Sequence, residues 1–86
     1  MHTIDTSTRL AVLNSSLSQL RREADRLGAG DTIHRLRNSI LTAQGALGLV
    51  ESRLAQGRSD EVDNLLELAE TRLREVRSLV ARRRRS

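Results

Sequence analysis

Apolar side chains recur at alternating spacings of three and four residues in three stretches of this 86-residue chain. That spacing places them on one face of an α-helix. The three faces run through residues 10–27, 33–54 and 62–80. The spacing therefore predicts an all-α fold of three amphipathic helices. Leu47 lies in the middle of the second face, so its replacement by alanine is expected to destabilise the fold strongly, whereas replacement of Arg53, which is off that face, is expected to change little.

Glycines and capping residues separate the three helices. The Gly-Ala-Gly run at 28–30 is expected to end the first helix, and Asp31 to cap the second. Gly57 is expected to end the second helix, and Ser59 or Asp60 to cap the third. Since so few residues join the second helix to the third, the two are predicted to form an antiparallel hairpin.

The chain is thereby divided into an N-terminal helix (1–30), a helical hairpin (31–81) and a basic tail (82–86). A two-helix hairpin does not cover both of its apolar faces. Either the first helix packs on it as a third member, or two chains pair into a dimeric four-helix bundle. Additional leucines widen the apolar faces and favour the larger bundle, so a homodimer is expected; they are Leu41, Leu49, Leu65, Leu68 and Leu79.

Composition excludes several kinds of site. The chain has no cysteine, no aromatic residue and only two histidines, so neither a thiolate metal site nor a bound cofactor is expected. No apolar run is long enough to span a membrane, and no basic-then-apolar leader is present. A cytoplasmic protein is the expectation.

Positive charge gathers at the end of the sequence. Fifteen arginines face eleven acidic residues, and four of these arginines form the run 82–85. Without that run the numbers balance, so the body of the chain is neutral. Nucleic-acid binding, which requires a basic surface on the folded domain, is not expected. Removing the tail is expected to abolish any binding to polyanions.

A second stripe runs beside the apolar face of the second helix. It contains His34, Asn38, Leu41, Gly45 and Gly48, at spacings of four and three. A glycine inside a helix costs about 1 kcal/mol relative to alanine. Two such glycines indicate that something packs closely on this stripe: a partner protein, the third helix or a second subunit.

An exposed imidazole on such a stripe can accept a phosphoryl group. A histidine on a helix surface is mostly neutral at cellular pH, and the neutral form is the nucleophile. The neighbouring Arg35 and Arg37 disfavour the cationic imidazole and are able to pair with phosphoryl oxygens.

The segment "HRLRNSIL" resembles the H-box of the dimerisation and histidine-phosphotransfer domain of two-component sensor kinases, including the branch that has Arg directly after His. The resemblance extends over about residues 31–80. It implies a dimeric four-helix bundle in which His34 is phosphorylated. It also implies that Asn38 orients a water molecule or the phosphoryl group during dephosphorylation, and that Leu36, Ile40 and Leu41 are buried.

Two positions depart from the common kinase pattern. Arg35 replaces the usual acidic general base, and Ser39 replaces the usual proline. The chain also has no Gly-rich nucleotide motif and no room for an ATP-binding domain. It is therefore expected to be at most a phosphotransferase, which exchanges phosphate with a response-regulator receiver domain or a histidine kinase. In that reaction the receiver supplies the Mg²⁺.

In an alternative interpretation the chain takes part in no reaction. It is a helical oligomerisation or adaptor module whose basic tail docks on a partner protein or a polyanion. In that case Leu41, Gly45 and Gly48 are the expected docking surface.

Overall fold

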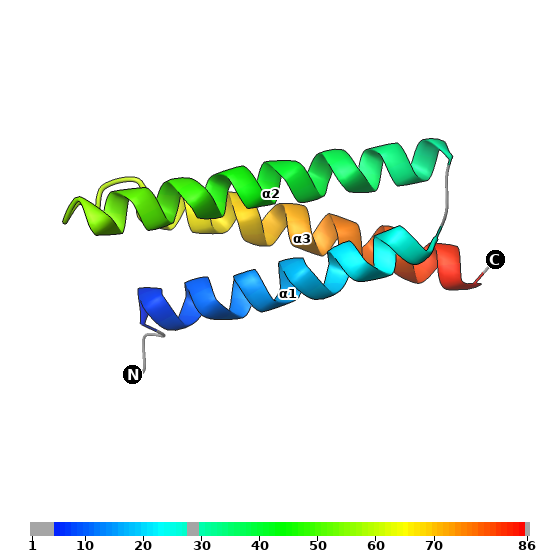
Figure 1. Ribbon diagram of the computed structural model, residues 1–86, viewed down its shortest axis with the longest axis horizontal. Helices are drawn as coiled ribbons and strands as arrows, with labels where there is room; N and C mark the ends of the chain where they lie inside the picture. The colour runs from blue at the N-terminus through cyan, green and yellow to red at the C-terminus, as the bar shows by residue number, and fades with distance from the viewer. Residues whose placement is uncertain (1–4, 28–29, 86) are drawn as a thin grey trace.

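The computed structural model describes residues 5–27 and 30–85, which form three α-helices without a strand. Helix α1 spans Thr6–Arg26, α2 spans Asp31–Ala55 and α3 spans Val62–Arg85. The all-helical prediction is confirmed. Each helix runs back alongside the one before it, so the end of α1, the start of α2 and the end of α3 lie together at one end of the molecule (Figure 1).

The apolar faces meet in one core. Helix α1 contacts both α2 and α3, and so takes the place of a third member on the hairpin. The predicted faces of α2 and α3 are buried in that core, apart from Leu54 near the end of α2. Leu47, with 1% of its surface exposed, is among the most deeply buried side chains. Ala46, which the spacing did not single out, is buried as well.

The start of α2 differs by one residue from its prediction. Gly30, with φ of 141°, is the N-cap, and Asp31 is the first helical residue. The left-handed region favours glycine because it has no Cβ. The carboxylate of Asp31 then lies in the first turn, where the helix dipole favours negative charge. Gly28, expected to help end α1, lies outside the described residues.

Gly57 ends α2, as its position predicted. Its φ is 71°, and its N–H donates to the Leu54 carbonyl at 3.1 Å. The next N–H, of Arg58, donates to the Arg53 carbonyl at 2.9 Å. These two bonds form a Schellman motif, which satisfies carbonyls that the helix end leaves free.

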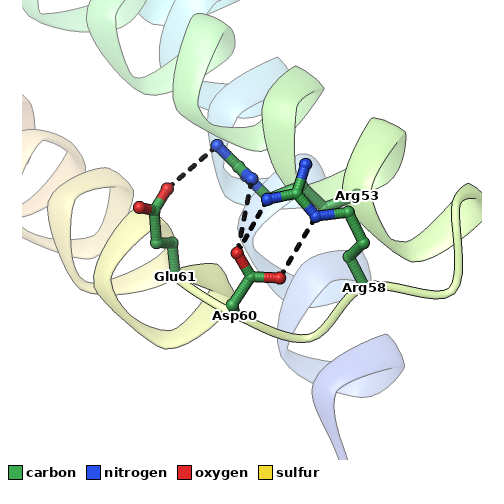
Figure 2. Close-up of polar contacts among 4 residues, drawn as sticks. All are labelled: Arg53, Arg58, Asp60 and Glu61. Atoms are coloured by element: carbon green, nitrogen blue, oxygen red, sulfur yellow. Dashed lines mark hydrogen bonds and ion pairs between the residues drawn. The ribbon is translucent and has the colours of Figure 1, made fainter.

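Four charged side chains hold the connection between α2 and α3 (Figure 2). Arg53 pairs with Glu61 at 2.9 Å and with Asp60 at 3.9 Å. Arg58 donates two hydrogen bonds to the Asp60 carboxylate, at 2.8 and 3.2 Å. These bonds, with the positive charges of Arg58 and Arg53, lower the pKa of Asp60.

The predicted cap of α3 is wrong. Helix α3 begins at Val62, so neither Ser59 nor Asp60 directly precedes it, and the Asp60 carboxylate binds arginine instead. Arg53, off the apolar face, is partly buried, with 20% of its side chain exposed, because it pairs with this connection. The backbone before α3 also turns sharply at Glu61, a non-glycine residue with φ of 66°.

Candidate functional site

His34 lies in the first turns of α2, on the surface of the bundle. It is the fourth residue of the helix, and its backbone N–H donates to the Gly30 carbonyl at 3.2 Å. The imidazole is exposed and makes no hydrogen bond or ion pair with any described residue. Both ring nitrogens are thus open to a reactant from solvent. The positive end of the helix dipole is close by and favours negative charge here.

The polar residues around His34 are also exposed. Arg35 and Arg37 extend into solvent on either side of the His34 stripe. Asn38 lies one turn further along α2, and its backbone carbonyl accepts a hydrogen bond from the Thr42 hydroxyl at 3.0 Å. The Asn38 amide itself binds no described side chain. One face of α2 therefore carries an imidazole, an amide and two guanidinium groups, all accessible.

The C-terminal part of the stripe, from Leu41 to Gly48, is exposed and two of its three residues are glycines without a side chain. An alanine methyl at Gly45 or Gly48 would meet no atom within 4 Å. Close packing against α3, one of the explanations for these glycines, is therefore excluded. Leu41 is 63% exposed and does not have the buried position that the resemblance implied, whereas Leu36 and Ile40 are buried.

Helix α1 adds residues to this face that the sequence did not connect with it. A shallow groove between α1 and α2 lies next to the stripe and is lined by Arg21, Asp25, Arg37, Ile40, Leu41 and Gln44. Arg21 and Asp25 are sixteen and twelve residues before Arg37 in the chain. No local spacing joins them to it, since their proximity depends on how α1 packs.

Within residues 5–27 and 30–85, no three acidic or histidine side chains gather closely enough to hold a metal ion. Over the same residues, no helix is long and apolar enough to cross a bilayer.

Comparisons with known proteins found no matching protein-family model, no matching curated protein and no matching solved structure.

Proposed function

We propose that this chain is a histidine phosphoacceptor module that exchanges a phosphoryl group with a response-regulator receiver domain through His34. The observation that supports it best is the free, exposed imidazole of His34, set on one stripe of α2 with Asn38. The H-box resemblance of the surrounding segment supports the same role.

The reaction needs little more than a positioned nucleophile. A nitrogen of the neutral imidazole attacks the phosphorus of an aspartyl phosphate on the receiver. A new N–P bond forms, the bond from phosphorus to the aspartyl oxygen breaks, and the aspartate leaves as a carboxylate. The proton on the other ring nitrogen passes to water. Arg35 and Arg37 pair with the phosphoryl oxygens, and the receiver supplies the Mg²⁺.

In this proposal the receiver docks on the C-terminal part of the stripe on α2, at Leu41, Gly45 and Gly48. Gly45 and Gly48 carry no side chain, so a partner helix can approach the α2 backbone closely there. Leu41, exposed between these glycines and Asn38, offers it an apolar contact. Because Arg35 stands where kinases have a general base, ATP alone is expected to leave His34 unmodified.

The proposal includes a homodimer that forms on the side of α2 and α3 facing away from α1. Leu49 on α2 lies two residues before Glu51, whose carboxylate accepts a hydrogen bond from α1. Leu68 on α3 lies two residues before Glu70, which pairs with α1. Two residues correspond to about 200° around a helix, so both leucines point away from α1. They are 51% and 39% exposed, and a second hairpin packed there would complete a four-helix bundle.

Incubation with a phosphorylated receiver domain tests the phosphoacceptor role. The wild-type chain should gain a phosphoryl group that is labile in acid and stable in base. His34→Gln should gain none, with an unchanged melting temperature, because the side chain is exposed. Asn38→Ala is the matched variant from the same face: it should be phosphorylated normally but lose the label at a different rate. Labelling of His34→Gln, or no labelling of the wild type by any receiver tested, would overturn the proposal.

A further inference from the structure

The charges of the chain separate along the length of the bundle. We define the arginine end as residues 17–26 of α1, 31–43 of α2 and 74–85 of α3, which lie together in Figure 1. It contains eleven of the fifteen arginines and four of the eleven acidic residues, a formal charge of +7. The rest of the chain, which we call the acidic end, has four arginines and seven acidic residues, a formal charge of −3.

The arginines of the two ends differ in their partners. All four arginines of the acidic end form ion pairs; they are Arg9, Arg53, Arg58 and Arg72. At the arginine end, six exposed side chains make no hydrogen bond or ion pair with any described residue; they are Arg21, Arg22, Arg26, Arg35, Arg37 and Arg74. Their positive charges are therefore available to a ligand outside the chain.

These guanidinium groups fit an extended array of phosphates. A guanidinium binds a phosphate through two parallel hydrogen bonds. Six of them, on three different helices, cannot all reach one small anion. The bundle is 27 Å across its second axis, a length over which a nucleic-acid duplex presents about 16 charges.

Two other features of the chain indicate which class of polyanion fits the arginine end. A protein that holds single strands stacks bases on aromatic side chains, and this chain has none. Insertion into a lipid surface requires apolar anchors, and Leu41 is the one exposed large apolar side chain described at the arginine end. We propose that the arginine end binds the phosphate backbone of double-stranded nucleic acid, without reading its sequence.

The proposal revises the expected role of the tail. Without Arg82 to Arg85, the arginine end still has seven arginines against four acidic residues. Truncation should therefore weaken binding and leave a measurable remainder. The proposal is independent of phosphoryl transfer.

Fluorescence anisotropy of a short labelled DNA duplex with the full chain tests the proposal. Affinity should fall about a thousandfold between about 50 and 200 mM salt, as six or more phosphate contacts require. Arg21→Gln/Arg22→Gln should reduce the slope of log affinity against log salt by about 2. The matched control Arg58→Gln/Arg72→Gln, with the same change of charge at the acidic end, should leave the slope unchanged. Circular dichroism checks that both variants keep their helices.

Three results would overturn the proposal. They are no binding at the lowest salt, equal losses in the two double variants, and binding to phosphatidylserine vesicles without binding to the duplex. His34→Gln should bind the duplex like the wild type. A chain that binds DNA but accepts no phosphate would therefore refute only the proposed function, and the reverse result only this inference.

Discussion

At the scale of single residues, the glycines differ in what they do. Gly45 and Gly48 have ordinary helical backbone angles and open space around the missing Cβ. Gly57 also has open space, but its φ of 71° lies in the left-handed region. Of these three glycines, Gly57 alone is required by its backbone conformation, as Gly30 is at the start of α2, and the other two lower the stability of α2 without an internal reason.

Alanine substitution should separate these two cases. Gly45→Ala and Gly48→Ala should each raise the free energy of unfolding by about 0.5–1 kcal/mol, because alanine loses less backbone entropy in a helix. Gly57→Ala should lower it by about 1–2 kcal/mol, because a Cβ is disfavoured in the left-handed region. Denaturant unfolding measures all three. A loss of stability in Gly45→Ala would mean that something packs against that position.

At the scale of the helix, burial distinguishes the leucines of α2. Leu47→Ala should cost about 2–5 kcal/mol of stability, because it leaves a cavity in the core. Leu41→Ala removes the same atoms from a side chain that is 63% exposed and lies outside the proposed dimer interface, and should stay within about 0.5 kcal/mol. Thermal melts of the two variants compare them directly. Equal losses would show that α2 is rotated relative to the core.

The connection between α2 and α3 should make stability depend on pH. The pKa of Asp60 is lowered from 3.8 in the folded state by the hydrogen bonds and charge of Arg58, and by Arg53. Because the pKa is lower in the folded state, the ionised carboxylate stabilises the fold at every pH above the pKa that Asp60 has in the unfolded chain. This stabilisation is lost as the pH falls through the pKa that Asp60 has in the folded state.

Asp60→Asn should therefore melt below the wild type at neutral pH, and the difference should disappear in acid. The effect should be small and weaker at high salt, because the pair is exposed. Glu67→Gln is a suitable control, since the Glu67 carboxylate has no partner among the described residues. A difference that persists in acid would assign the effect of Asp60 to something other than its charge.

At the scale of the whole molecule, α1 decides which surfaces remain for a second copy. It covers one side of α2 and α3, and leaves Leu49 and Leu68 exposed on the other. The dimer that we propose forms on the side away from α1, with each α1 outside the shared bundle.

Sedimentation at micromolar concentrations tests the dimer. The wild type should sediment as a dimer, and Leu68→Glu as a monomer with unchanged helix content, because the new charge would be buried at the interface. Val12→Glu adds the same charge at an apolar residue of α1 that is 58% exposed, against 39% for Leu68, and should remain dimeric. A wild-type species of 9.6 kDa would instead indicate a three-helix monomer.

Local sequence patterns predicted the three helices and most of their buried faces. Helical periodicity is local, so spacings of three and four residues identified the buried residues of α2 and α3 almost completely. Glycine at a helix end is local too, which is why Gly57 was predicted correctly. The candidate site is local for the same reason: His34, Asn38, Leu41, Gly45 and Gly48 share one stripe because they share one helix.

The short connection predicted that α3 runs back along α2, but only the tertiary structure placed α1 on this hairpin as a third member. The charge of the chain without its tail sums to zero, so the sequence indicated a neutral body. The directions of the three helices bring Arg21, Arg22 and Arg26 of α1 to the same end as Arg35 and Arg37 of α2, while seven of the eleven acidic residues lie at the other end. The same packing covered Arg53 and left Leu41 exposed. Such proximities depend on contacts between residues far apart in the chain, about which local spacing contains no information.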